Sequence, residues 1–270
     1  MTLALLVNGV SPTNSSQAIA ADDRGLHYGD GLFETLLLKD GRVRFLDDHL
    51  QRLFLGCERL GIQTPDRQIL LAEISQVATA ASSGVLKIIV TRGASGRGYR
   101  PTTTVAPNRV IALHALGESL KQPLRLRWCE IRLGRNTRLA GIKHLNRLEQ
   151  VLAQGEWREG EADEGLMMDT EGELVCATAG NIFLVRDGGL LTPDVRFCGV
   201  RGVMRTQVLR MAAKLDIPVS EEPLWPHDLD SASEVFVTNA VRGIRSAASL
   251  DGLQWSEFPV ANRLADALES

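Results

Sequence analysis

Lys143 stands where a cation is chemically unusual. The chain has five lysines against 25 arginines, and this lysine lies in LAGIKHLNRLEQVLAQ, residues 139–154, just ahead of a predicted helix. A helix N-terminus favours anions, yet His144 and Arg147 bring further basic side chains to the same end. Burial or neighbouring cations lower the pKa of a lysine amine and allow it to form a Schiff base with a carbonyl group. The competing interpretation is a solvated surface lysine.

A glycine-bearing helix start, FCGVRGVMRTQV at residues 197–208, offers a place for a phosphate group. Gly199 and Gly202 let the backbone approach a ligand closely. A helix that begins near Val203 has free N–H groups and a positive dipole end. The spacing is neither that of a Walker motif nor that of a dinucleotide-binding fingerprint. An ordinary glycine turn before a helix is the competing interpretation.

Polar residues at the ends of other predicted elements extend this set. Arg52, in HLQRL, lies beside the apolar stripe of a predicted helix and can serve as a phosphate-binding fork or as an exposed helix arginine. Thr178 and Asn181 stand at the entrance of one predicted strand, and Thr238 and Asn239 at the exit of another. Turn hydrogen bonding explains these four residues as well as ligand binding does. Together the lysine, the arginine, the glycine-rich helix start and the polar strand ends suit a phosphate-bearing aldehyde cofactor better than a metal or a nucleotide.

The composition narrows the class of protein. The 270 residues are 44% hydrophobic and 23% charged, with a net charge of −3. These values are ordinary for a globular chain and give no electrostatic reason to expect nucleic acid or a membrane surface as a partner. No apolar run approaches the ~18 residues of a membrane span, and the first residues lack the pattern of a signal peptide. The cysteines and histidines show neither a disulfide framework nor metal-ligand spacing, so we expect a cytoplasmic protein without a metal.

Hydrophobic periodicity predicts an α+β (mixed α/β) chain in two segments. In residues 1–118, predicted strands accompany two helices, and a polar loop rich in glycine and proline spans residues 94–108. GESLKQP, residues 117–123, is the best linker candidate. The remaining residues combine strand–turn–strand units with three helices. We therefore expect a small N-terminal domain, 1–118, and a larger C-terminal domain, 119–270.

Local signals place Lys143 just outside a helix. Asn146 can cap this helix, and Glu149 at the third helical position would complete a capping box. The apolar face of the helix is predicted to consist of Leu148, Val151 and Leu152. On this pattern Lys143 lies on the connection that leads into the helix.

Six stretches of the sequence resemble the fold-type IV pyridoxal-phosphate enzymes. They are DRGLHYGDGLFET (23–35), HLQRL (49–53), VTRGASGRGY (90–99), GIKHLNRLEQ (141–150), NIF (181–183) and GVRGVMR (199–205). The resemblance covers nearly the whole chain. The family includes branched-chain aminotransferases, D-amino-acid aminotransferases and aminodeoxychorismate lyases. LAGIKHLNRLEQVLA and the GRGY loop look most like the lyases.

This resemblance implies a fold, a cofactor and an assembly. The expected fold has a small N-terminal α/β domain and a larger C-terminal domain with a barrel-like sheet core, which carries Lys143. The implied cofactor is pyridoxal 5′-phosphate, bound between the domains of each subunit of a homodimer. Lys143 matches the Schiff-base lysine, which also acts as acid and base. Arg52 matches the phosphate-binding arginine.

Further site residues follow from the same resemblance. The positions implied to contact the cofactor are Cys176, Asn181, Val203, Met204, Asn239 and Ala240, with the backbone N–H groups of Val203 and Met204 holding the phosphate. The positions implied to contact a small-molecule substrate with two carboxylates are His27, Tyr28, Arg97 and Tyr99.

Cys176 departs from the family pattern. The family places a glutamate five residues before the Asn of NIF, where it pairs with the protonated pyridine nitrogen. Here that position is Cys176, and the nearest glutamate, Glu173, falls on the opposite face of a regular strand unless a bulge intervenes. A thiol is a weak hydrogen-bond donor and cannot stabilise a pyridinium as a carboxylate does. We therefore expect a weaker electron sink than in the family.

This departure favours elimination over amino transfer. Aromatisation drives the release of pyruvate from aminodeoxychorismate, whereas a transaminase depends more on the electron sink. The leading hypothesis is thus an aminodeoxychorismate lyase that makes 4-aminobenzoate for folate synthesis. The alternatives are a D-amino-acid or branched-chain aminotransferase of the same fold, and a non-catalytic binding protein that kept the fold.

Overall fold

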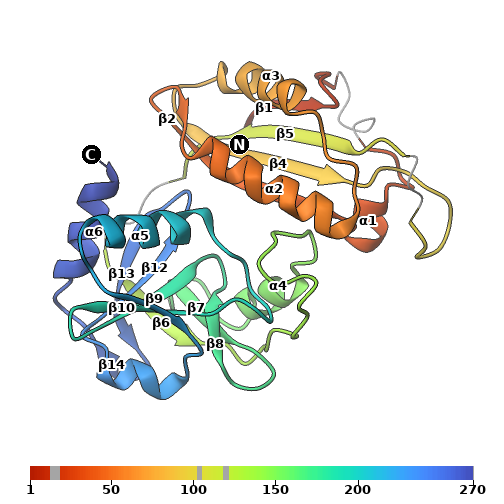
Figure 1. The fold of residues 1–270 in the computed structure, drawn as a ribbon. Coiled ribbons are helices and arrows are strands. Elements are labelled where there is room, and N and C mark those ends of the chain that lie inside the picture. Colours follow the sequence, from red (N-terminus) through yellow and green to blue (C-terminus); the bar gives the residue numbers. More distant parts are fainter. Residues whose placement is uncertain (13–18, 102–104, 118–121, 270) are drawn as a thin grey trace. The chain divides into compact units, whose positions relative to one another are not determined.

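The computed structural model describes residues 1–12, 19–101, 105–117 and 122–269 (Figure 1). The chain divides into two compact units. The first contains Met1–Glu118 and Ile142–Asn146, and the second contains Ser119–Gly141 and Arg147–Ser270. The division expected from the sequence, 1–118 and 119–270, differs from this one at Ile142–Asn146. The segment that carries Lys143 belongs to the first unit and not to the C-terminal one.

The first unit is built on an antiparallel sheet, which over the described residues has five strands in the order β1-β5-β4-β2-β3. The strands are β1 (Thr2–Val7), β2 (Gly31–Lys39), β3 (Arg42–Val43), β4 (Gly84–Thr91) and β5 (Asn108–His114). Asp40 and Gly41 join β2 to β3 with φ angles of 52° and 72°, the left-handed pair of a tight hairpin turn. Asp-Gly is a common hairpin-turn sequence, and here it joins an antiparallel pair of strands.

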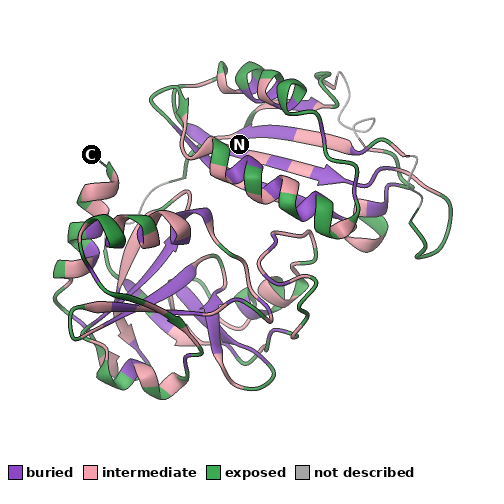
Figure 2. Cartoon of the chain, in the orientation of Figure 1, coloured by how far each residue is buried: buried purple, intermediate pink, exposed green. Residues whose placement is uncertain are grey.

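Helices α1 (Arg24–Tyr28), α2 (Leu46–Leu60) and α3 (Arg67–Ala78) complete this unit. Most residues of β2 are buried, including Leu32, Leu36 and Leu38 on one face, and α2 packs against this strand. A Cβ on Gly56 would lie 2.7 Å from a methyl of Leu32, so glycine allows the helix to approach the strand closely. In Figure 2 a buried stripe and an exposed stripe alternate along α2, as the apolar spacing of Leu50, Leu53 and Cys57 predicts.

The segment Ile142–Asn146 belongs to this unit because it completes one edge of β2. The short β3 pairs only with Leu38 and Lys39 at the far end of β2. At the near end, the Phe33 N–H donates to the Lys143 carbonyl at 2.9 Å, and the Leu145 N–H donates to the Gly31 carbonyl at 3.0 Å. These hydrogen bonds satisfy backbone groups that an open sheet edge would leave unpaired.

The second unit is built on a curled sheet with nine strands among the described residues. The sheet order is β11-β10-β9-β12-β13-β6-β7-β8, with β14 paired to β13. The strands are β6 (Leu124–Trp128), β7 (Glu164–Met168), β8 (Leu174–Ala177), β9 (Asn181–Arg186), β10 (Gly189–Pro193), β11 (Val219–Glu222), β12 (Glu234–Asn239), β13 (Gly243–Leu250) and β14 (Leu253–Gln254). The helical elements are α4 (Leu148–Gln154), α5 (Val203–Lys214), the 3₁₀ helix η2 (Pro226–Ser231) and α6 (Pro259–Glu269).

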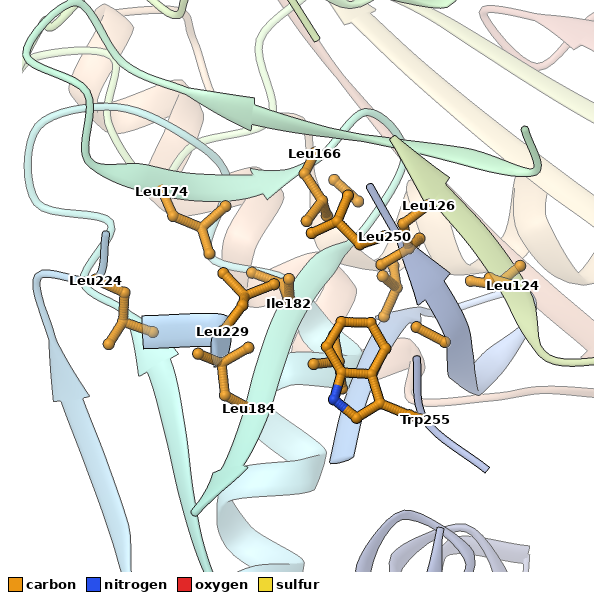
Figure 3. Packing of buried hydrophobic residues seen from close by; sticks show 14 residues of the cluster. Leu124, Leu126, Leu166, Leu174, Ile182, Leu184, Leu224, Leu229, Leu250 and Trp255 are labelled. Atoms are coloured by element: carbon orange, nitrogen blue, oxygen red, sulfur yellow. The ribbon is translucent and has the colours of Figure 1, made fainter. Parts of the chain in front are cut away.

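Alternation along β9 separates two hydrophobic cores. Ile182 and Leu184 point into the hollow of the curled sheet, where they pack with leucines from β6, β7, β8 and β13 and with Trp255 (Figure 3). Phe183 and Val185 point the other way and pack beneath α5 and α6. The barrel-like sheet core expected for the larger unit is thus confirmed.

Helix α4 differs from its predicted form. Its N-cap is Arg147, and Asn146 does not cap it. The Asn146 side chain instead donates to the Gly29 carbonyl at 3.1 Å. Glu149 accepts from the Gly134 N–H at 2.8 Å, so the predicted capping box is wrong. The predicted apolar face is also exposed, at 69% for Leu148, 63% for Val151 and 52% for Leu152.

Within the described part of the chain, no helix is both long enough and apolar enough to cross a membrane. All four cysteines are free and buried.

Candidate active site

Lys143 is held rigidly in the first unit. The carbonyl of Lys143 and the N–H of Leu145 are both bonded to β2. The side-chain amine lies 4.3 Å from the centre of the Phe33 ring, a cation–π distance. The backbone is therefore fixed on both sides of a half-buried amine, as a residue that presents a nucleophile in one position requires.

Arg52 is tied to a buried carboxylate. Its Nε donates to Oε1 of Glu34 at 2.8 Å, and a terminal guanidinium nitrogen donates to Oε2. Nδ1 of His49 lies 2.6 Å from the same Oε2. Burial raises the pKa of the Glu34 carboxyl, but the charge and hydrogen bonds of Arg52, with His49, outweigh burial and lower the pKa to about 2. Glu34 is therefore ionised and accepts from both partners, so Nδ1 of His49 carries a proton.

The four residues expected to bind substrate lie on α1 and on the loop after β4. The Tyr28 and Tyr99 rings are 5.4 Å apart, and the His27 ring lies 5.8 Å from that of Tyr28. Arg97 is exposed on the same loop as Tyr99, whose exposed fraction is 85%. The structure thus brings His27, Tyr28 and Tyr99 together and leaves Arg97 at the surface of the loop.

Arg24 of α1 anchors this loop through hydrogen bonds to its backbone. Its guanidinium donates to the Gly98 carbonyl at 2.8 Å and to the Tyr99 carbonyl at 3.0 Å. Its Nε donates to Asp30 at 2.8 Å, and its guanidinium carbon lies 4.8 Å from the centre of the Tyr28 ring. Arg24 is only 4% exposed. A single buried cation therefore connects α1 with the loop that carries Arg97 and Tyr99.

In the second unit, α5 begins as the sequence predicts. Gly202 is its N-cap, and among the described residues no side chain caps it. The N–H groups of Val203 and Met204 belong to the first turn, which has no carbonyl partners within the helix. A Cβ on Gly202 would lie 2.1 Å from Oδ1 of Asn181, so only glycine fits here. The start of α5 can accept an anion, and Asn181 lies against it.

The loop before α5 is hydrogen-bonded to Gly141, which precedes Lys143 by two residues in the sequence. The Gly141 N–H donates to the Gly199 carbonyl at 2.9 Å, and the Arg201 N–H donates to the Gly141 carbonyl at 3.0 Å. Gly199 has a φ of 82°, which favours glycine. Asn181 adds a hydrogen bond from its side-chain nitrogen to the Val200 carbonyl at 2.8 Å. The peptide two residues before Lys143 therefore supports the helix start.

Asn239 and Ala240 lie at the end of β12, next to the turn that joins β8 to β9. Oδ1 of Asn239 accepts from the N–H groups of Val241 and Arg242 at 3.1 and 2.8 Å. Its side-chain nitrogen donates to the Ala179 carbonyl at 3.1 Å. Turn hydrogen bonding thus accounts for the Asn239 side chain. The Thr238 hydroxyl is buried and has no hydrogen-bond partner among the described residues, so it is a polar group available for a ligand.

Cys176 is a neutral thiol. It is 7% exposed and packs in a cluster that includes Cys129 and Cys198. Burial raises the pKa of the Cys176 thiol to about 12, so it supplies no negative charge. A register shift does occur between β7 and β8 at Met167 and Met168. Glu173 nevertheless pairs with Arg135 at 2.9 Å and so has another partner.

Glu164 is a second buried carboxyl, on β7. It accepts from the Thr178 hydroxyl and from the N–H groups of Gly165 and Ala179, and Gln154 of α4 donates to Thr178. Burial raises the pKa of the Glu164 carboxyl despite these hydrogen bonds. This network holds the β8–β9 turn, which Asn239 also contacts through the Ala179 carbonyl.

Comparisons with known proteins identify the family of the chain. The sequence model of amino-transferase class IV matches residues 31–250. The chain belongs to this family. It is 31% identical over 260 residues to an aminodeoxychorismate lyase of Vibrio harveyi, covering 94% of each chain. It is 30% identical over 257 residues to a putative branched-chain-amino-acid aminotransferase of Methanocaldococcus jannaschii, covering 93% of this chain and 88% of the other.

A solved structure adds a further likeness. The crystal structure of 4-amino-4-deoxychorismate lyase from Pseudomonas aeruginosa has a TM-score of 0.92 and 40% sequence identity to this chain, and 98% of each chain is covered. Amino-transferase class IV proteins are fold-type IV enzymes that use pyridoxal 5′-phosphate, so the family, the fold and the cofactor expected from the sequence are confirmed.

The residues present suit the phosphate and the aldehyde of pyridoxal 5′-phosphate but not its pyridine nitrogen. The open first turn of α5, the orphaned hydroxyl of Thr238 and the Arg52 guanidinium suit a phosphate, and the Lys143 amine suits an aldehyde. Cys176 is the exception, because a neutral thiol cannot supply the counter-charge of a pyridinium.

Sequence reasoning did not single out four buried residues that hold candidate residues or their partners through hydrogen bonds: Arg24, Glu34, His49 and Glu164. A signal existed for Glu34, since strand alternation places it on the same face as Leu32 and Leu36, and a charge on an apolar face needs partners. No comparable signal identifies Arg24, whose carbonyl partners lie about 75 residues further along the chain.

Proposed function

We propose that this class IV enzyme converts 4-amino-4-deoxychorismate to 4-aminobenzoate and pyruvate. The observation that carries the proposal is the 40% identity over 98% of both chains to the Pseudomonas aeruginosa lyase. The neutral thiol of Cys176 supports the same choice, because elimination needs a weaker electron sink than amino transfer does. The product would serve folate synthesis.

Lys143 is the residue proposed to carry the cofactor and to move the proton. Bound pyridoxal 5′-phosphate supplies an electron sink for the carbon that bears the substrate amine. The Lys143 amine would take the proton from that carbon. The carbon–oxygen bond at the neighbouring carbon then breaks, the ring becomes aromatic, and the three-carbon group leaves and takes up a proton as pyruvate.

The residues proposed to hold the cofactor are those that the family resemblance implies. Arg52 and the first N–H groups of α5, at Val203 and Met204, would bind the phosphate, with Asn181 fixing the helix start. Asn239 and Ala240 are proposed to close the phosphate site, and Cys176 to face the pyridine nitrogen.

The substrate is proposed to bind at the loop that Arg24 fastens. Arg97 offers an exposed guanidinium suited to one of the two substrate carboxylates. Tyr28, Tyr99 and His27 form an adjoining aromatic group that suits the flat ring of the substrate.

Product analysis tests this proposal. The purified protein is incubated with aminodeoxychorismate, and 4-aminobenzoate and pyruvate are measured in equal amounts. A parallel reaction contains a D-amino acid or a branched-chain amino acid with a 2-oxo acid. Formation of 4-aminobenzoate supports the lyase, and absence of this product with rapid amino transfer overturns it.

The main alternative is an aminotransferase for D- or branched-chain amino acids. The 30% identity to the Methanocaldococcus jannaschii protein favours this alternative. A non-catalytic binding protein would instead bind the cofactor with neither turnover. The same two assays therefore separate all three functions.

The proposed enzyme is a cytoplasmic homodimer without a metal. Sedimentation equilibrium of the full chain tests the assembly, and a mass of one chain over the micromolar range would contradict it. Activity after dialysis against a chelator tests the metal, and fractionation of the source cells tests the location.

A further inference from the structure

We propose that Glu34 is a positioning residue, which fixes the Arg52 guanidinium in the orientation that receives a phosphate group. The inference rests on the proposed function, because that function makes Arg52 a phosphate ligand. Glu34 itself would not touch the ligand. It would act entirely through Arg52, with His49 holding Glu34 in turn.

The contacts define the direction of the guanidinium. Arg52 reaches Glu34 through Nε and one terminal nitrogen, so two donors meet the two carboxylate oxygens side by side. A two-point contact fixes the plane of the guanidinium as well as its place, which a single hydrogen bond does not. His49 lies one helical turn before Arg52 on α2, and its Nδ1 contacts Oε2 of Glu34 at 2.6 Å. Each of these three side chains therefore restricts the orientation of the others.

The burial of this group needs an explanation other than stability. Glu34 is 1% exposed and lies on the leucine-lined face of β2 that packs against α2. Compared with apolar residues of similar volume, an ion pair there contributes little net stability, because removing both charges from water costs about as much as their attraction returns. Apolar residues at these positions would suit the α2–β2 contact equally well. Orientation of Arg52 before a ligand arrives is a benefit that apolar residues cannot supply, since it removes an ordering cost from binding.

A second buried pair in the same unit gives a matched control. Arg109 of β5 donates to Glu73 of α3 through Nε and a terminal nitrogen, at 3.0 and 2.6 Å to its closest oxygens. Glu73 is 5% exposed, close to the burial of Glu34. Neither residue of this second pair belongs to the proposed site. The two pairs share chemistry and helix-to-strand geometry and differ in whether a ligand is expected.

The experiment compares Glu34→Gln with Glu73→Gln in the full chain. Each protein is titrated with pyridoxal 5′-phosphate and with pyridoxal, which lacks the phosphate, and the two dissociation constants are measured by absorbance. We expect Glu34→Gln to lower the preference for the phosphate-bearing form at least tenfold while pyridoxal affinity stays within about twofold. Glu73→Gln should leave the preference unchanged.

A double mutant separates positioning from a general effect. Arg52→Lys keeps a cation but cannot make the two-point contact with Glu34. If Glu34 acts through Arg52, Glu34→Gln has no further effect on the preference in the Arg52→Lys background. Additive losses overturn the inference. Equal losses for pyridoxal and its phosphate in Glu34→Gln also overturn it, because they indicate a structural role alone.

The outcome also distinguishes this inference from the proposed function. If the unmodified protein itself shows no preference for the phosphate-bearing form, the phosphate site of the proposed function fails and the inference fails with it. If the unmodified protein prefers pyridoxal 5′-phosphate and Glu34→Gln does so equally, only the inference fails. Should Glu34→Gln not fold, Glu34→Asp, which keeps the charge but withdraws it by one methylene, undergoes the same titrations with the same expected loss of preference.

Discussion

The amine of Lys143 lies 4.3 Å from the centre of the Phe33 ring, while the backbone N–H of Phe33 donates to the carbonyl of Lys143. One residue thus holds both the peptide and the side chain of the lysine. A second lysine, Lys87 on β4, places its amine 5.4 Å from the centre of the same ring. The chain therefore offers two lysines in related surroundings, with only one in the proposed catalytic role.

Lys143→Ala should abolish the covalent attachment of the cofactor. The variant should lose the yellow absorbance of the bound aldehyde and at least a thousandfold in kcat, because it lacks the amine that is proposed to hold the cofactor and to move the proton. Borohydride reduction followed by peptide mass analysis should find the cofactor on Lys143 in the unmodified protein. Lys87→Ala is the control and should retain the absorbance. Cofactor attached to Lys87 would contradict the assignment.

Arg24→Lys should loosen the loop of residues 95–99, which carries the proposed substrate-binding residues Arg97 and Tyr99. Lysine keeps the charge beside Asp30 but loses the fork that reaches Gly98 and Tyr99. Hydrogen bonds from charged donors contribute about 1.5–3 kcal/mol each, so KM for the substrate should rise roughly tenfold with a smaller change in kcat. Amide exchange across residues 95–99 should also become faster. Arg109→Lys serves as the control, and an unchanged exchange rate in Arg24→Lys would refute the anchoring role.

Gly202→Ala should weaken phosphate binding. The added Cβ would lie 2.1 Å from Oδ1 of Asn181, so either the helix start or Asn181 must move. Affinity for pyridoxal 5′-phosphate should fall about tenfold or more, because the N–H groups of the first turn lose their alignment. A Cβ on Gly117 meets nothing within 4 Å, so Gly117→Ala is the control. Titration of both variants measures the effect, and equal affinities would show that the start of α5 is not the phosphate site.

Cys176→Glu should shift the reaction toward amino transfer. A carboxylate at this position can pair with a pyridinium and strengthen the electron sink, whereas the buried thiol is neutral. The ratio of amino transfer to 4-aminobenzoate formation should increase several-fold. Cys176→Ser, which keeps a small neutral side chain, should leave the ratio unchanged. An unchanged ratio in Cys176→Glu would mean that Cys176 does not limit the sink.

Acid should remove the contribution of Glu34 to stability. The pKa of Glu34 falls from 4.5 to about 2 on folding, so the folded state binds the proton less readily than the unfolded chain does. The contribution is therefore present above about pH 4.5 and is lost as the pH falls toward about 2, and it amounts to roughly 3 kcal/mol. Urea unfolding across this range should show that loss in the unmodified protein. Glu34→Gln should show a loss smaller by that amount, and Asp47→Asn, at an exposed position, should behave like the unmodified chain.

Local chemistry in the sequence was sufficient to predict the elements that position the site. Asp40-Gly41 favours left-handed backbone and so fixes the β2–β3 hairpin. The glycines before Val203 predict the start of α5, which the structure places at that residue. Both signals depend on a few adjacent residues.

Contacts with residues distant in the sequence determine several features that local sequence signals predict wrongly. Asn146 has the chemistry of a helix cap, but the Gly29 carbonyl, 117 residues earlier, is its partner. Glu149 would complete the cap, but it binds the Gly134 N–H. The helical spacing of Leu148 and Val151 predicts a buried face, although spacing shows only which residues share a face and not what covers it. The pairing of Arg52 with Glu34 likewise joins α2 to β2, and the sequence alone does not predict that these two elements are in contact.

Because Ile142–Asn146 is hydrogen-bonded to β2, the N-terminal sheet can be completed only after this later segment has been synthesised. All five strands of the N-terminal sheet have been made once the ribosome passes His114. The near edge of β2 stays open until residue 145 has emerged, by which time β6 has also been translated. A nascent chain folds largely as it appears, so the peptide that carries Lys143 would be the last piece added to an otherwise finished sheet. The Lys143 amine would thus reach its final place only after the sheet that holds it has formed.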